Sequence, residues 1–129
     1  MLRKSTIMRE TLRLIGEHLS VISEDLGLQN TPMTVLLIEE DSGLRGECRY
    51  IDGTIEVTLN LTAMRCINRK AGKERVVNTL AHELRHGWQY LNWSGGPKYF
   101  MGPSQSFELY YVSEAETDAR SYARTYCGR

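Results

Sequence analysis

The segment from Lys73 to Leu91 reads KERVVNTLAHELRHGWQYL, and its apolar residues recur at helical spacing. This recurrence is expected of a helix that is buried along one stripe. The stripe consists of Val76, Val77, Leu80, Leu84, Gly87 or Trp88, and Leu91. His82 and His86 fall on a neighbouring flank four residues apart, so their imidazoles stand one above the other. The segment therefore predicts a packed helix that presents two histidines to one point.

The residues from His82 to His86 form the pattern H-E-x-x-H. Residues four apart on a helix have Cβ atoms about 5–6 Å apart, so both imidazoles can reach one metal ion. Glu83 projects from an adjacent part of the same surface, where its carboxylate could accept a proton from water at the ion without being a ligand. The pattern predicts a hydrolytic zinc site with His82 and His86 as ligands and Glu83 as the general base.

A catalytic zinc ion usually takes three protein ligands and leaves a fourth position for water. A second helix is predicted over residues 108–126, with a packing stripe of mostly small residues. The stripe consists of Val112, Ala115, Ala119, Ala123 and Tyr126. Glu114 stands on the flank of this stripe, and we expect it to be the third ligand. Asp118, four residues on, would accept the remaining ring N–H of a ligating histidine and fix its tautomer.

Glu116 is the rival third ligand, because carboxylates two residues apart cannot be separated by sequence. On a helix it points in a different direction from Glu114 and has no carboxylate four residues further on. We therefore favour Glu114.

H-E-x-x-H followed by E-x-x-x-D resembles the motif pair of the gluzincins, the thermolysin-like clan of zinc metallopeptidases. The short spacing is similar to that of the minimal gluzincins and of the small ImmA/IrrE-type and SprT-like metallopeptidases carried by phages and mobile elements. The resemblance covers the range from Val76 to Tyr126. It implies a zincin-like fold, Zn²⁺ as cofactor and a peptide or protein substrate.

The expected activity is zinc-dependent hydrolysis of a peptide bond by a metal-activated water, with Glu83 as the base. One alternative is a catalytically silent zinc-binding regulatory protein of a phage or mobile element. A nucleic-acid-binding module is another. A thiol hydrolase that uses Cys48 or Cys66 with His82 is formally open, but it gives Glu83 and Glu114 no role.

The chain has 129 residues, which predicts a single domain over residues 1–129. Sixteen basic and sixteen acidic side chains balance, so no net field draws nucleic acid or a membrane surface to the protein. The basic residues between Arg65 and Arg75 are interpreted as a solvated loop face, and nucleic acid is not an expected partner. No span approaches transmembrane length. Three cysteines without a C-x-x-C pair argue against a disulfide framework and favour a cytoplasmic location.

The remaining segments predict an α+β arrangement, in which helices stack on one face of a small three-stranded sheet. Residues 6–26 have the spacing of an amphipathic helix that ends at Gly27. Residues 34–39 contain a continuous apolar run, which predicts a strand buried on both faces. The expected order is helix, three strands, active-site helix and C-terminal helix.

Asp52-Gly53 predicts a β-hairpin with a type I′ turn between residues 47–51 and 54–59. Pairing Ile51 with Thr54 sets Arg49 opposite Glu56 and gathers the apolar side chains on the other face. In zincins the strand nearest the cleft runs antiparallel to an extended substrate. By that resemblance the segment from Ile55 to Leu61 would be this edge.

The connection from Asn92 to Ser106 has no evident secondary structure and should border the metal as a lid or binding loop. Tyr99, Tyr110 and Tyr111 are candidates to donate a hydrogen bond to the oxyanion of a tetrahedral intermediate. Packing beside a helix is the commoner role of such tyrosines.

Overall fold

The computed structural model describes residues 4–63, 70–97 and 113–129, and the statements below concern these residues. Its elements are α1 (Lys4–Leu26), β1 (Met33–Ile38), β2 (Gly46–Ile51), β3 (Thr54–Asn60), α2 (Lys70–Asn92) and α4 (Glu114–Cys127). The predicted α+β class and the order of the elements are confirmed. Within the described ranges no helix combines the length and apolar character needed to cross a bilayer.

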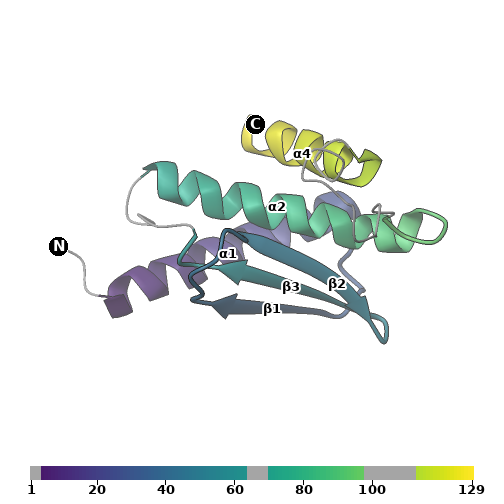
Figure 1. The fold of residues 1–129 in the computed structure, drawn as a ribbon. Helices are drawn as coiled ribbons and strands as arrows, with labels where there is room; N and C mark the ends of the chain where they lie inside the picture. The colour runs from purple at the N-terminus through teal and green to yellow at the C-terminus, as the bar shows by residue number, and fades with distance from the viewer. Residues whose placement is uncertain (1–3, 64–69, 98–112) are drawn as a thin grey trace.

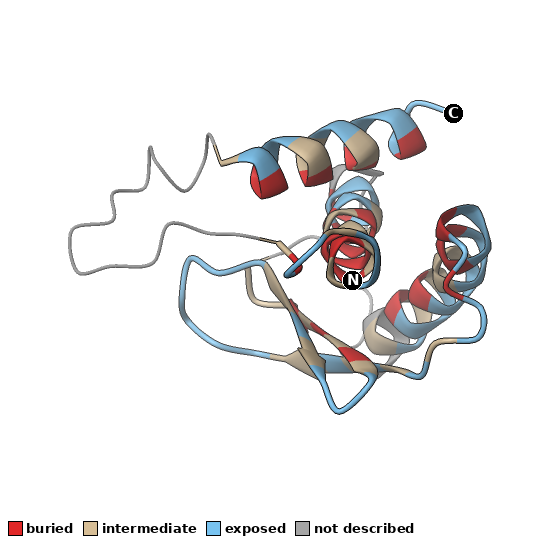
Figure 2. Cartoon of the chain, turned by 90° about the vertical axis from the view of Figure 1, so that its right-hand side faces the viewer, coloured by how far each residue is buried: buried red, intermediate tan, exposed pale blue. Residues whose placement is uncertain are grey.

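The elements form three layers, which Figures 1 and 2 show from two sides. The sheet is the first layer, and α1 and α2 lie side by side over one of its faces. α4 packs against the side of α2 that faces away from the sheet. α2 is therefore enclosed from two directions, and a polar side chain on it can be buried in the contact with α4.

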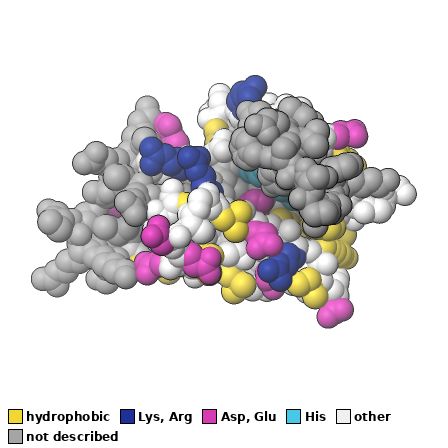
Figure 3. All heavy atoms as spheres, in the orientation of Figure 1, with side chains coloured by type: hydrophobic (Ala, Val, Ile, Leu, Met, Phe, Trp, Pro, Cys, Tyr) yellow, Lys and Arg dark blue, Asp and Glu magenta, His cyan; other side chains and the backbone are white. Residues whose placement is uncertain are grey.

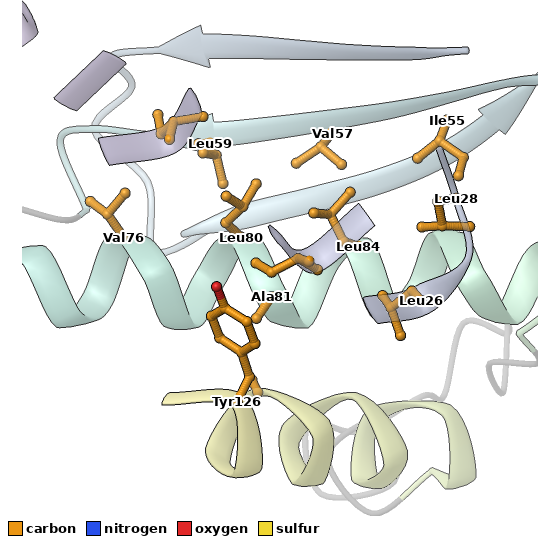
Figure 4. Close-up of a cluster of buried hydrophobic side chains, with 13 residues drawn as sticks. Leu26, Leu28, Ile55, Val57, Leu59, Val76, Leu80, Ala81, Leu84 and Tyr126 are labelled. Atoms are coloured by element: carbon orange, nitrogen blue, oxygen red, sulfur yellow. The ribbon is translucent and has the colours of Figure 1, made fainter. Parts of the chain in front are cut away.

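The core lies between the sheet and the two helices that cover it. In Figure 4, Ile55, Val57 and Leu59 of β3 point toward Leu80 and Leu84 of α2. All five of these side chains are fully buried. Because burial of each such side chain contributes about 1.5–3 kcal/mol, this contact holds α2 in place on the sheet.

The sheet has the order β1-β3-β2, with β3 parallel to β1 and antiparallel to β2. The predicted hairpin register is confirmed, since Ile51 pairs with Thr54 and Arg49 with Glu56. Asp52 and Gly53 have φ angles of 50° and 80°. A type I′ turn requires positive φ at both central positions.

Two expectations about the strands are wrong. β3 lies in the middle of the sheet, so the segment from Ile55 to Leu61 is not its edge. β1 is an edge strand buried on one face only, and Leu36 is 42% exposed. The reason is that helices cover just one face of the sheet, so alternate residues of the run from Val35 to Ile38 face the core and the open side.

The predicted N-terminal helix is confirmed as α1, and Gly27 follows it with a φ of 70°. In α2, Gly87 lets the helix backbone come close to β3. A Cβ atom at this position would lie 3.0 Å from both Cγ2 and Cδ1 of Ile55, a side chain with no exposed surface. Close approach at Gly87 thus sets the distance between α2 and the sheet.

We predict that Gly16→Ala and Gly87→Ala change the stability of the metal-free protein in opposite directions. Gly16 is exposed in α1 and a Cβ there meets nothing within 4 Å, so alanine should raise the free energy of unfolding by about 0.5–1 kcal/mol. At Gly87 the same gain is opposed by overpacking, which typically costs about 1–3 kcal/mol. Urea denaturation measures both changes. Equal stabilisation by the two substitutions would contradict the close approach of α2 to β3.

Candidate metal site

α2 carries His82 and His86 on the flank that faces α4. Their ring centroids are 4.9 Å apart and the ring planes are inclined by 76°. His86 is 3% exposed, while His82 is partly exposed. The four-residue spacing therefore brings the two imidazoles together as the sequence predicts, with His86 on the inner side.

Glu116 of α4 completes the group. Its Oε2 lies 2.8 Å from Nε2 of His82, and its Oε1 lies 3.1 Å from Nε2 of His86. Each of the three side chains offers one ligand atom, and these atoms all lie within 4.8 Å of one another. His82, His86 and Glu116 could therefore hold a metal ion between α2 and α4.

The structure places Glu116, rather than the expected Glu114, beside the histidines. Glu116 is 4% exposed, whereas Glu114 is exposed and lines a separate pocket with Trp93, Ser94 and Gly96. α4 begins at Glu114, and its N-cap Ser113 accepts a hydrogen bond from the backbone N–H of Glu116. Residues 108–112 of the predicted helix lie outside the described residues.

The helical phase of the packing stripe explains this difference. At about 100° per residue, Glu116 lies about 65° from the mean direction of Ala115, Ala119, Ala123 and Tyr126, whereas Glu114 lies about 135° away. All four stripe residues are buried. The signal for Glu116 was therefore present in the spacing.

Glu83 is 6% exposed and faces the start of β2. A Cβ at Gly46 would lie 3.1 Å from Cγ of Glu83, so the strand backbone passes close to this side chain. Burial raises the pKa of the Glu83 carboxyl to about 7, although the nearby His86 and His82 oppose the shift. Glu83 thus sits beside the three-residue group as a carboxyl that is easily protonated.

Gln89 is a site residue that the sequence analysis missed. His86 Nδ1 lies 2.8 Å from Oε1 of Gln89, and Gln89 Nε2 donates to Oδ2 of Asp118 at 2.9 Å. Asp118 was expected to accept directly from a histidine. Instead it binds Arg85 at 2.7 and 3.1 Å and accepts a hydrogen bond from Gln89, which in turn contacts His86. The available signal was the position of Gln89, three residues after His86 on the same helix.

The donor chemistry of the three side chains fits a metal ion. Both ring nitrogens of His86 face oxygen atoms, which suits either an imidazolium or a neutral ring whose Nε2 binds a cation. Burial alone would lower the pKa of His86, but the hydrogen bond to Glu116, the Glu83 charge and Gln89 together raise it. A cation at Nε2 would take the place of the proton that an imidazolium carries on this nitrogen.

Of the two candidate nucleophilic cysteines, the structure describes Cys48. Burial, Glu83 and Glu47 raise the pKa of the Cys48 thiol far above its usual range, which does not suit a nucleophile. Cys66, Arg65 and the three candidate tyrosines, Tyr99, Tyr110 and Tyr111, lie outside the described residues. In Figure 3, histidine side chains reach the surface of the drawn face next to acidic side chains.

No family model, curated protein or solved structure matches this chain.

We predict that Glu116→Gln reduces zinc affinity by more than the roughly 10–100-fold typical of losing an outer-shell partner. An amide in place of the carboxylate removes the anionic oxygen that faces both Nε2 atoms. Glu114→Gln is the matched control and should retain one zinc ion per chain. Equilibrium dialysis followed by metal analysis measures both. Zinc retained by Glu116→Gln but lost by Glu114→Gln would reverse the assignment.

Proposed function

We propose that this protein is a zinc-dependent hydrolase that cleaves peptide bonds. The observation that carries the proposal is the contact of one Glu116 carboxylate with Nε2 of both His82 and His86, next to the buried Glu83. Two imidazole nitrogens and one carboxylate oxygen form the donor set of many catalytic zinc sites, which leave one position for water. His82 and His86 on α2 and Glu116 on α4 would hold the ion.

Zinc is favoured over calcium and magnesium because imidazole suits zinc, whereas those two ions prefer sites built from oxygen atoms. The ion, when bound, polarises a carbonyl group and makes water a nucleophile near neutral pH. The chain supplies the proton transfers. Glu83 lies on the helix that carries both histidines, and its burial makes it a better proton acceptor.

In the proposed reaction a water oxygen bonds to the carbonyl carbon of the substrate while Glu83 takes a proton from that water. The C–N bond then breaks, and Glu83 passes the proton to the leaving amine. Water is divided between the two products, and Glu83 returns to its starting state. A peptide or protein substrate follows from the resemblance to gluzincins. A cytoplasmic site of action would agree with the free thiols of Cys48 and Cys127.

We predict that Glu83→Gln keeps one zinc ion per chain and lowers the cleavage rate by about 10²–10⁴-fold, the usual contribution of a general base. Glu74→Gln is the matched control, since Glu74 lies on the same helix and is exposed, and it should cleave at the wild-type rate. Cleavage is measured on a proteome-derived peptide library by mass spectrometry.

Two outcomes would contradict the hydrolase proposal. Wild-type protein that contains zinc but cleaves no peptide would instead be a zinc-binding regulatory protein. Full cleavage by Glu83→Gln would exclude Glu83 as the base.

A further inference from the structure

We propose that Gln89 is a positioning residue, whose one buried amide aligns the ligands that α2 and α4 contribute. The inference rests on the metal site proposed above. Oε1 of Gln89 faces Nδ1 of His86, while its Nε2 donates to the carbonyl oxygen of Ala115, the residue before Glu116. The same side chain thus contacts one histidine ligand and the backbone next to the carboxylate ligand.

The orientation of the Gln89 amide follows from its neighbours. Its nitrogen lies 3.0 Å from the Ala115 carbonyl oxygen and 2.9 Å from Oδ2 of Asp118. Both of these oxygens only accept hydrogen bonds, so the NH₂ group must face them and the amide oxygen must face His86. Gln89 has no exposed surface, so bulk water cannot compete for these hydrogen bonds.

The Gln89 oxygen in turn decides which nitrogen of His86 carries hydrogen. With an acceptor 2.8 Å from Nδ1, the neutral ring places its proton there and leaves the lone pair on Nε2. Nε2 is the nitrogen that faces Glu116. Gln89 therefore prepares His86 to bind a cation at the point where the second helix delivers its carboxylate.

Asp118, which is paired with Arg85, accepts a hydrogen bond from the Gln89 amide. Nε and Nη2 of Arg85 donate to the two carboxylate oxygens of Asp118 at 2.7 and 3.1 Å. The guanidinium carbon also lies 3.6 Å from the centroid of the Trp88 ring. A two-point ion pair stacked on an aromatic ring has little freedom to turn, so the Asp118 oxygen that accepts from Gln89 stays in place.

The neutral amide also affects the charge at the site. Ligating histidines often donate to a carboxylate, which adds negative charge behind the metal. Here the nearest such carboxylate, Asp118, is separated from His86 by Gln89 and is paired with Arg85. Glu116 contacts both histidines directly, whereas the group at Nδ1 of His86 is a neutral amide that adds no negative charge.

The test compares zinc affinity and the state of the His86 ring in four proteins, namely wild type, Gln89→Met, Gln89→Glu and the double variant Gln89→Glu/Asp118→Asn. Affinity is measured by competition with a chromophoric chelator, and the Nδ1–H of zinc-loaded His86 by ¹⁵N NMR. Gln89→Met should lower affinity about 10–100-fold and lose the hydrogen-bonded Nδ1–H signal.

Gln89→Glu should also bind zinc weakly, because it sets a carboxylate against Asp118. The double variant should bind zinc more tightly than Gln89→Glu and regain the Nδ1–H signal, because the asparagine amide at position 118 can donate to the carboxylate at position 89. Its affinity should stay below that of wild type, because the hydrogen bond to the Ala115 carbonyl oxygen is not restored. Gln89→Glu and the double variant therefore test the inference even if Gln89→Met does not fold.

Ala123→Gly is the control for a general loosening of α4. Ala123 is fully buried, and it lies toward the C-terminal end of α4, away from Gln89. It should bind zinc as wild type does and keep the Nδ1–H signal. Wild-type affinity and signal in Gln89→Met would overturn the inference, as would an equal loss in Ala123→Gly. Zinc binding by wild type without peptide cleavage contradicts only the hydrolase proposal, because neither readout here uses activity.

Discussion

The packing of α2 between the sheet and α4 is the constraint on which the rest of the structure depends. One face of α2 buries Leu80 and Leu84 against β3, and Gly87 removes the side chain that would hold the helix off Ile55. A second face of α2 packs against α4. The site lies where these faces meet, so the core packing that stabilises the domain also sets the distance between the histidines and Glu116.

This arrangement buries polar groups that would destabilise the fold if they were alone. His86, Gln89 and Glu116 are all buried at the contact of α2 with α4. In the described part of the chain no buried side-chain nitrogen or oxygen lacks a hydrogen-bond partner. A connected polar network of this kind fits a single arrangement of the two helices, because any other arrangement would leave a buried donor or acceptor unpaired. A bound cation would add the charge that balances Glu116.

Much of the fold could be predicted because its signals are local. Apolar spacing indicated α1 and α2, and Asp52-Gly53 with its flanking residues indicated the hairpin and its register. The same spacing placed His82 and His86 on one flank. The strand order could not be predicted in this way. Val35 to Ile38 is apolar throughout, and whether such a run lies at an edge or in the centre depends on which strand pairs with it from elsewhere in the chain.

The sequence by itself determined the pair of histidines and the neighbouring Glu83, because positions within five residues of a helix have their relative directions set by backbone geometry. The spacing of the packing stripe on α4 already favours Glu116 over Glu114. Only the tertiary structure decided that Glu116 contacts both histidines, and that Gln89 stands between His86 and Asp118. Those choices depend on where α4 begins and how it is rotated against α2. That rotation is set by the burial of Ala115, Ala119, Ala123 and Tyr126, which lie between 29 and 44 residues along the chain from the histidines. No local pattern encodes the angle at which two helices meet.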